Sequence, residues 1–245
     1  MLFSGGCGKW MEVIGLSNIG LVRERNEDNY YIDKNRQIFI VCDGMGGHKG
    51  GDVASKLAVD TVVGVISNQA NISQYLLNEA IKKAHYNIWQ QGQNNPDLFR
   101  MGTTIILAHI TNDTLHLHHV GDSRAYLVRG QSLTRLTNDH TLAAEMEKSG
   151  IDENKRKSYN HILTRALGIN EDLVIDNIIL DLQDDDIILL CSDGLTDLLT
   201  DVEILNIIKS NINQIPIIGR NLISAAIDNG GNDNVTLILI QINGR

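Results

Sequence analysis

The middle of the chain is a series of short apolar runs joined by tight turns. From Gly102 onward it reads GTTIILAHI, LHLHHVG, RAYLVRG and SLTRL, with the polar turn TNDT between the first two runs. Runs of this kind are typical of β-strands, and tight turns join neighbouring strands only in antiparallel order. Similar runs lie at residues 12–17, in QIFIVC, in IILLC and in VTLILIQI. The chain is therefore predicted to form antiparallel sheets.

Helices are predicted in pairs between and after the blocks of strands. Apolar residues recur at spacings of three and four from residue 52 to about 69 and again over 77–88, which is the pattern of amphipathic helices. Nearer the C-terminus, Thr200 and Glu203 form a capping box, and Pro216 suits the first turn of a last helix. We expect an α+β fold, a four-layer αββα sandwich in which helix pairs cover the outer faces of two packed antiparallel sheets.

Composition excludes several classes of protein. The 245 residues include 21 basic and 30 acidic side chains, a formal charge of -9, with no Lys/Arg-rich run, so nucleic acid is not an expected partner. The longest apolar runs fall far short of the roughly 18 residues of a membrane helix. Three cysteines are too few for a full disulfide framework, and no secretory signal opens the chain. We expect a cytoplasmic, monomeric protein without membrane association.

Two segments differ from the rest of the chain. Residues 1–10 precede a second methionine, Met11, which opens the first strand-like run, so we interpret them as an N-terminal extension that is disordered or foreign to the native protein. Residues 11–245 are expected to form a single domain. Within it, about 142–158 is charged and poorly patterned, and we expect a mobile flap there.

Single carboxylates stand where apolar strands end. Asp43 follows IFIVC, Asp122 follows HLHHVG, Asp193 follows IILLCS, and Asp233 comes just before VTLILI. Clustered carboxylates in partly buried loops repel one another unless a cation neutralises them, and oxygen ligands favour hard divalent ions. The pattern predicts a Mg²⁺ or Mn²⁺ site. Zinc and calcium are disfavoured, because the sequence has neither a Cys/His set at structural spacing nor a calcium-binding loop.

Glycine and arginine residues accompany these acids. Glycine directly follows two of them, in CDGMGGH and CSDGL, and a residue without Cβ lets a backbone carbonyl and water approach an ion closely. In RERNED, Arg23 precedes Glu27 and Asp28. If this segment lies beside the acids, Arg23 would offer a bidentate fork to a phosphate. In an extended segment Arg25 would point the other way, so we interpret it as solvated surface.

Eight segments together resemble a known family. In chain order they are GLVRERNEDN, VCDGMGGHKGG, MGTT, VGDSRAYL, LTNDHT, LTRALG, CSDGL and GGNDNVT. They resemble the metal-dependent protein phosphatase 2C family in its short bacterial form, over residues 11–242. Because eight motifs occur in order and most lie at strand ends, the resemblance is specific. It implies a β-sandwich flanked by helix pairs, with a two-metal cleft at one end.

The resemblance also implies metal ligands. Asp43 would bridge both metals, the carbonyl of Gly44 would bind one of them, and Asp193 with Asp233 would hold the other. In bacterial relatives a third, weaker metal lies beside this pair, and Asp122 matches its ligand, with Asp193 shared between the sites.

Further roles follow from the same resemblance. Glu27 and Asp28 would fix metal-bound waters or bind a metal directly, and Arg23 would bind the phosphate. Some family members carry a histidine two residues after the bridging aspartate as a candidate general acid, but Met45 stands there, and a thioether cannot donate that proton. His48, in the same loop, is a candidate for contact with the substrate or the leaving group.

The implied reaction is hydrolysis of phosphoserine and phosphothreonine in proteins by direct attack of a metal-bridging hydroxide. Two cations about 4 Å apart lower the pKa of a bridging water enough to make hydroxide available near neutral pH. Arg23 and the metals would stabilise charge on the equatorial oxygens of the phosphoryl group. Phosphorylated proteins, including a bacterial Ser/Thr kinase, are the expected partners.

Two other functions are compatible with parts of the pattern. A haloacid-dehalogenase-type phosphatase also uses an aspartate after a strand, but it needs a second aspartate where Met45 stands. A phosphatase-like module that binds a phosphoprotein without turnover is the non-enzymatic alternative. Such modules usually lose metal ligands, whereas all the matching acids are present in this chain.

Several further polar or reactive residues are interpreted as structural. His109, His116 and His118 could approach one another across the TNDT turn, but we interpret them as polar residues on a half-exposed sheet face. The run 184–186, three aspartates, is interpreted as a solvated turn. Two buried cysteines, Cys42 and Cys191, are expected to be inert, because apolar burial next to anions suppresses the thiolate.

Overall fold

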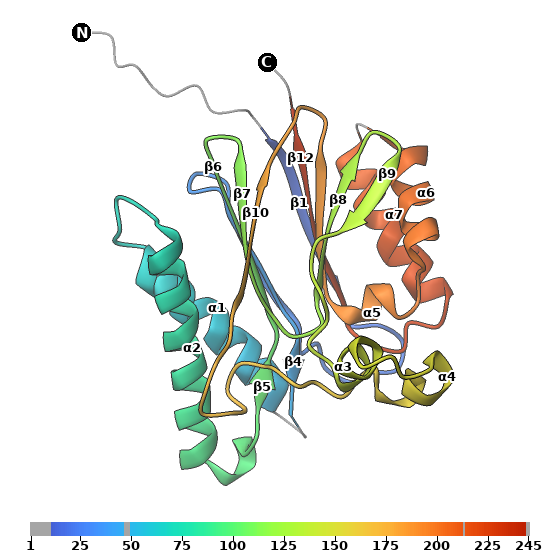
Figure 1. The fold of residues 1–245 in the computed structure, drawn as a ribbon. Helices are drawn as coiled ribbons and strands as arrows, with labels where there is room; N and C mark the ends of the chain where they lie inside the picture. The colour runs from blue at the N-terminus through green and yellow to red at the C-terminus, as the bar shows by residue number, and fades with distance from the viewer. Residues whose placement is uncertain (1–10, 47–49, 213, 244–245) are drawn as a thin grey trace, which may run out of the picture.

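Two five-stranded sheets pack face to face at the centre of the molecule (Figure 1). The computed structural model describes residues 11–46, 50–212 and 214–243. In spatial order, the first sheet contains β1 (Met11–Asn18), β12 (Val235–Ile242), β11 (Ile187–Cys191), β8 (Arg124–Arg129) and β9 (Ser132–Arg135). The second contains β10 (Asp176–Asp181), β7 (Thr114–Val120), β6 (Ile105–Thr111), β3 (Ile38–Cys42) and β2 (Asn29–Asp33). The neighbouring strands in both sheets are antiparallel, as the sequence predicts.

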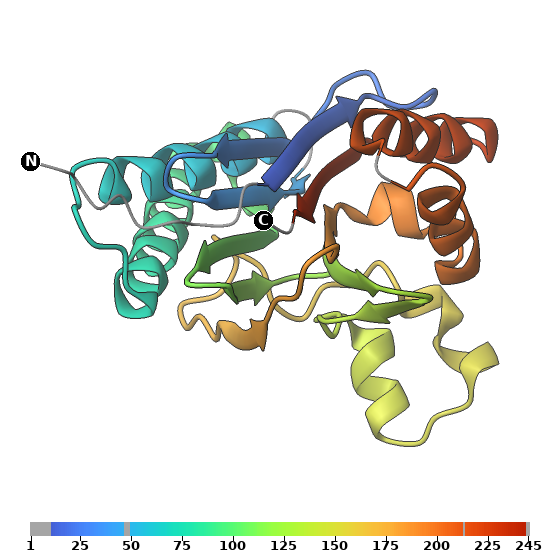
Figure 2. The same ribbon diagram turned by 90° about the horizontal axis from the view of Figure 1, so that it is seen from above.

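Helix pairs cover the outer faces of the two sheets (Figures 1 and 2). On the second sheet lie α1 (Gly50–Ile66) and α2 (Gln74–Asn94), and on the first lie α6 (Asp201–Ser210) and α7 (Ile215–Asp228). The capping box of Thr200 and Glu203 forms at the start of α6, and Pro216 lies in the first turn of α7. The α+β prediction of a four-layer sandwich is therefore confirmed. The first predicted helix begins two residues earlier and ends three residues earlier than expected.

The continuous apolar runs are explained by burial on both faces of each sheet. On β3, Ile38, Ile40 and Cys42 contact the layer of α1 and α2. Phe39 and Val41, which alternate with them, contact the opposite sheet. Because successive side chains of a strand point to opposite faces, a strand between two layers needs apolar residues at every position. The side chains of β11 alternate in the same way. Every second one packs between the two sheets, and the others pack against α6 and α7.

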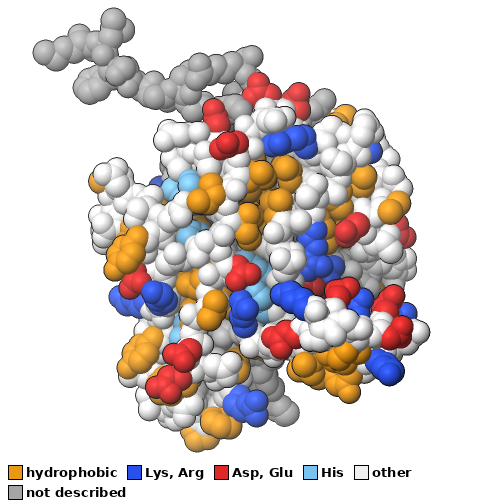
Figure 3. Space-filling model, viewed as in Figure 1, with side chains coloured by type: hydrophobic (Ala, Val, Ile, Leu, Met, Phe, Trp, Pro, Cys, Tyr) orange, Lys and Arg blue, Asp and Glu red, His pale blue; other side chains and the backbone are white. Residues whose placement is uncertain are grey.

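Shorter elements surround one end of the sandwich. The two-residue strands β4 (Gly44–Met45) and β5 (Gly102–Thr103) pair with each other, and α5 (Asp193–Thr196) follows β11 directly. The predicted flap contains α3 (Leu142–Lys148), α4 (Glu153–Arg156) and a 3₁₀ turn, Lys157–Tyr159, while a second 3₁₀ turn, Pro96–Leu98, follows α2. Lys and Arg side chains alternate with Asp and Glu side chains over the surface formed by α3 and α4 (Figure 3), where Arg156 pairs with Glu147. The flap is thus a small helical subdomain with a mixed-charge surface.

The histidines of the central hairpin are more buried than the sequence suggests. His109 lies opposite His116, as predicted, but His109 is only 7% exposed and His118 only 1%. The prediction of a half-exposed face is wrong for His109 and His118, whereas His116 is half-buried, as expected. This part of the sheet is covered by α2. Its polar side chains hydrogen-bond the histidines, with Asn78 at 3.0 Å from His118 and Gln74 at 2.6 Å from His116.

The acidic turn before β11 also differs from its prediction. Asp184 and Asp185 are exposed, but Asp186 is 1% exposed and forms an ion pair of 2.7 Å with Arg129. Its carboxylate also accepts a hydrogen bond of 2.7 Å from the backbone N–H of Gln183. The Asp186 side chain is therefore buried within the turn, which it stabilises through these bonds, and does not face solvent.

The remaining expectations about the chain concern its ends and its surroundings. Residues 1–10 lie outside the described residues, so the expected domain boundary at residue 11 stays a prediction. Within the residues that the structure describes, none of the helices combines the length and the apolar character needed to cross a bilayer.

Candidate metal and phosphate site

The predicted acidic residues lie together because of the sheet register. Strand β12 runs antiparallel to β11, so the start of β12 lies beside the end of β11, and Asp233 comes next to Asp193. Strands β3 and β7 are both antiparallel to β6 and therefore end at the same edge, each followed by an aspartate. Residues 19–28 connect β1 to β2 at this edge, since Asn18 pairs with Val235 and Asn29 with Cys42.

A cavity of about 710 Å³ opens at this edge. Seven of the predicted site residues line it, namely Arg23, Glu27, Asp43, Gly44, Asp122, Asp193 and Asp233. Met45 also lines the cavity, so the position where some relatives place a histidine offers a thioether. Asp28 lies behind this wall and is 9% exposed. His48 falls outside the described residues.

The carboxylates raise one another's pKa. Burial, reinforced by the charges of Asp28 and Asp193, raises the pKa of Asp43 well above its ordinary value. Burial also raises the pKa of Asp193 to about 6, with Asp197 adding to the effect, and the carboxyls of Asp43 and Asp193 are close enough to share a hydrogen bond. The pKa of Asp122 is raised by burial and by Asp193. Bound cations would favour the ionised carboxylates and so oppose these upward shifts in pKa.

Asp28 offers a further observation that fits a cation site. Its Oδ2 accepts a hydrogen bond of 2.8 Å from Ser192 Oγ, whereas its buried Oδ1 has no hydrogen-bond partner. Burial raises the pKa of Asp28 to about 7, against the hydrogen bonds from Thr236 and Ser192. A buried acceptor without a partner is costly unless water or an ion satisfies it. This oxygen and the surrounding oxygen-only ligands fit a hard divalent cation.

Threonines that the sequence analysis did not assign hold Asp43 in place. The backbone N–H of Asp43 donates to Thr104 Oγ1 at 2.9 Å, and the carbonyl of Asp43 accepts from Thr103 Oγ1 at 2.8 Å. Thr104 Oγ1 also lies 2.7 Å from Ser123 Oγ, next to Asp122. The MGTT motif therefore connects the loops of Asp43 and Asp122. In the sequence, the only indication of this role is that MGTT is one of the eight ordered motifs.

The two glycines after the acids are needed for close backbone packing. A Cβ on Gly44 would collide with the carbonyl oxygens of Gly51 and Glu27, and a Cβ on Gly194 would collide with the carbonyl of Asn234. Each glycine thus lets two loops of the site approach each other closely. Glycine at position 44 is thus required for loop packing as well as for the expected access of an ion to its carbonyl.

Arg23 lies directly beside the acids. Its Nη2 donates a hydrogen bond of 2.7 Å to Asp233 Oδ2, and this bond raises the pKa of the guanidinium further. About half of the Arg23 side chain is exposed, so it remains accessible from the cavity. Arg25 is exposed, as expected for solvated surface, but it lines the cavity too, because residues 21–25 contain bends instead of forming the extended segment that would turn it away.

Asn234 holds the loop that contains both arginines. Its Oδ1 accepts from the backbone N–H of Glu27 at 2.7 Å, and its Nδ2 donates to the carbonyls of Ile19 and Arg25, each at 2.9 Å. Burial raises the pKa of Glu27. Asn234 belongs to the motif GGNDNVT, but its reach across more than 200 residues is visible only in the structure.

The segment that follows the flap contributes a second wall to the site. His161 and Leu163 line the main cavity, and His161 also lines a neighbouring cavity of about 410 Å³. The two cavities share Asp122 and Asp193, and the second contains Asp197. No local pattern indicates His161 or Asp197, because neither residue follows an apolar run. The acids thus lie between Arg23 on one side and the segment that follows the flap on the other.

Comparison with known proteins agrees with this geometry. The family model described as "Protein phosphatase 2C" matches residues 19–235. The chain is 35% identical to "Serine/threonine phosphatase stp" of Listeria welshimeri, over 91% of this chain and 93% of that protein. Serine/threonine phosphatase Stp1 from Staphylococcus aureus superposes with a TM-score of 0.89 at 32% identity, covering 97% of each chain.

One solved relative contains metal. The catalytic domain of the serine threonine protein phosphatase PstP, in complex with two manganese ions, superposes with a TM-score of 0.86 at 31% identity, covering 96% of this chain and 99% of that one. The fold and the site thus define a divalent-metal-dependent phosphatase. This chain belongs to the protein phosphatase 2C family.

Proposed function

We propose that this chain removes phosphate from phosphoserine and phosphothreonine in proteins by direct attack of water on phosphorus, without a covalent phosphoenzyme. Family membership makes it a metal-dependent protein-serine/threonine phosphatase. The observation that supports the proposal best is the meeting of Asp43, Asp193 and Asp233 with Arg23 around one cavity. Carboxylates this close together repel one another, and two divalent cations would neutralise that repulsion and supply the charge that phosphoryl transfer needs.

We infer the roles of individual residues from their positions. Asp43, the Gly44 carbonyl, Asp193 and Asp233 would hold a pair of Mn²⁺ or Mg²⁺ ions, with Asp122 holding a third, weaker ion and with Glu27 and Asp28 close behind. When bound, such ions lower the pKa of a water molecule and neutralise phosphate charge.

Arg23 would orient the phosphate through the part of its guanidinium that is not engaged by Asp233. Met45 cannot donate a proton to the leaving serine or threonine oxygen. The source of that proton therefore lies elsewhere in the cleft.

A phosphothreonine peptide tests the proposal. We expect release of phosphate with Mn²⁺, loss of activity with a chelator, and loss after Asp193→Ala. The matched control is Asp60→Ala, an exposed aspartate on α1 away from the cavity, which should retain activity. Metal-independent hydrolysis, or no hydrolysis at any metal concentration, would contradict the proposal.

The biological setting is a finer proposal. Protein phosphatase PhpP of Streptococcus pneumoniae is 34% identical to this chain over 95% of its length. We propose that the substrates are phosphoproteins of the cytoplasm, including a Ser/Thr kinase that this enzyme dephosphorylates as a monomer. A phosphoproteome comparison with and without the protein tests this, since the substrates should gain phosphoserine or phosphothreonine in its absence.

A phosphatase-like module that only binds phosphoproteins is not favoured. Such a module has no need for ionisable ligands, yet Asp43, Asp122, Asp193 and Asp233 are all present and all line the cavity.

A further inference from the structure

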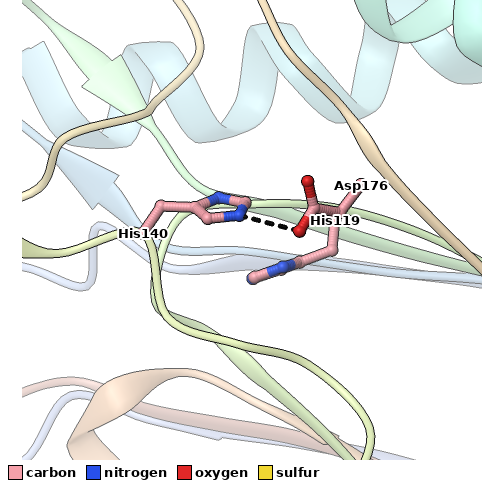
Figure 4. Close-up of side chains that lie close together, drawn as sticks. All are labelled: His119, His140 and Asp176. Atoms are coloured by element: carbon pink, nitrogen blue, oxygen red, sulfur yellow. Dashed lines mark hydrogen bonds and ion pairs between the residues drawn. The ribbon is translucent and has the colours of Figure 1, made fainter. Parts of the chain in front are cut away.

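A second cluster of ionisable side chains lies beside the metal loops, outside the cavity described above. His119 at the end of β7, His140 before the flap, and Asp176 at the start of β10 have ligand-type atoms within 4.8 Å of one another (Figure 4). His140 Nε2 lies 3.1 Å from Asp176 Oδ2, and the two histidine rings stack with centroids 4.7 Å apart. His119 is fully buried and His140 is 4% exposed.

The hydrogen bonds of His140 argue against a metal ion in this cluster. Its Nδ1 accepts the backbone N–H of Gly121 at 3.0 Å, so the neutral ring has its proton on Nε2 and donates it to Asp176. A metal on Nε2 would require the proton on Nδ1, where it would face the N–H of Gly121. Arg165 Nη1 occupies the other oxygen of Asp176 at 3.0 Å. His140 and Asp176 therefore form a hydrogen-bonded pair rather than a set of metal ligands.

His140 hydrogen-bonds both the backbone N–H and the backbone carbonyl of Gly121. It accepts the N–H of Gly121 on its ring, and its own backbone N–H donates to the carbonyl of Gly121 at 2.9 Å. Gly121 has φ of +112°, and a Cβ there would lie 2.5 Å from Thr104 Cγ2, so only glycine fits. Because glycine has many accessible conformations, external hydrogen bonds must select this one. The next residue is Asp122.

The same residue is also tied to the base of the flap. The carbonyl of His140 accepts from the backbone N–H of Thr164 at 2.8 Å, and Leu142 N–H donates to the carbonyl of Ile162 at 2.8 Å. The carboxylate of Asp176 sets the ring orientation from β10. His140 thus links β10, and the segment 162–164 that follows the flap, to the peptide that precedes Asp122.

We propose that His140, oriented by Asp176, is a positioning residue for Asp122 and thereby for the weaker third metal site. This inference rests on the proposed function. Groups that orient a ligand typically affect metal affinity nearly as strongly as ligands do, because a ligand displaced by about 1 Å no longer meets the ion. His140 itself touches neither substrate nor metal in this proposal.

Direct Mn²⁺ binding tests the role, with the EPR signal of free Mn²⁺ as the readout. The wild type should bind two ions tightly and one weakly, and Asp122→Ala should remove the weak one. His140→Ala should weaken the third site roughly 10- to 100-fold and leave the tight pair within about twofold. His140→Asn retains an acceptor for the Gly121 N–H and should restore most of the loss, whereas His140→Gln, which retains only a donor toward Asp176, should not.

The matched control is His118→Asn, which removes another buried histidine of β7 that contacts α2 instead of the Gly121 loop. It should leave all Mn²⁺ sites unchanged. If His140→Ala does not fold, the comparison of the Asn and Gln variants decides the question. Unaltered weak binding in His140→Ala, equal weakening of all sites, or no advantage of Asn over Gln would each overturn the inference.

Failure of this inference can be distinguished from failure of the proposed function. If the wild type binds Mn²⁺ but hydrolyses no phosphopeptide, the proposed function is wrong whatever the variants do. If the wild type is active and His140→Ala binds three ions with wild-type affinities, only the positioning role is wrong.

Discussion

Replacing Asp28 by asparagine should stabilise the metal-free protein near neutral pH. Burial raises the pKa of Asp28 to about 7 from an ordinary value of 3.8. A carboxyl with a raised pKa binds its proton more tightly in the folded state than in the unfolded chain, so the folded state loses stability as the pH rises from about 4 to about 7. The full shift corresponds to about 4 kcal/mol.

The expected gain for Asp28→Asn at pH 7.5 is about 2–4 kcal/mol without metal, because part of the cost is shared with Asp43 and Asp193. The asparagine carbonyl can still accept the hydrogen bond from Ser192. The assay is urea unfolding of chelator-treated protein at pH 5, 6 and 7.5. The wild type should lose stability toward pH 7.5, and the variant should show a smaller loss.

Two controls make the result interpretable. Asp60→Asn removes an exposed carboxylate on α1 and should not change the pH dependence. Saturating Mn²⁺ should restore the stability of the wild type at pH 7.5, since bound cations neutralise the same charges. If the metal-free wild type were equally stable at pH 5 and 7.5, or if Asp28→Asn were destabilising at pH 7.5, the argument from carboxylate repulsion would be wrong.

Three further outcomes are expected. Arg23→Ala should lower kcat/KM for a phosphopeptide roughly 100-fold, with Arg23→Lys recovering only part, because a lysine cannot form the guanidinium fork; steady-state kinetics measures this. Thr104→Val should lower the activity roughly 10- to 100-fold with an unchanged circular dichroism spectrum, since it removes the hydroxyl that accepts from Asp43. Asp186→Asn should destabilise the fold by about 1–3 kcal/mol in urea without changing activity per folded molecule, because it removes the carboxylate that pairs with the charge of Arg129.

Much of the architecture followed from local pattern. IFIVC and IILLC were identified as strands because they are short, apolar and followed by turn residues, and the structure adds why they contain no polar position: both faces are covered. The capping box at Thr200 predicted the start of α6 correctly, since it depends on residues only three apart. Boundaries that depend on packing were less accurate, as at the end of α1.

Two of the errors share a physical cause. Asp186 and His118 are polar residues in turn or strand patterns that usually face solvent, yet Arg129 and Asn78, which come from distant segments, bond them in the interior. In both cases the partner is remote in sequence. Arg25 has a different cause, because its segment bends instead of running extended.

The sequence alone determined which residue types were available for chemistry: acids at the ends of apolar strands, an arginine near two of them, and a methionine where a proton donor was expected. It did so because strand runs and turn residues are local properties. Only the tertiary structure decided that Thr104 and Asn234 hold the site together, that His161 lines the cavity, and that His140 hydrogen-bonds the peptide before Asp122. Those relations depend on sheet register and on loops that meet across up to about 200 residues, and no local pattern encodes such distances.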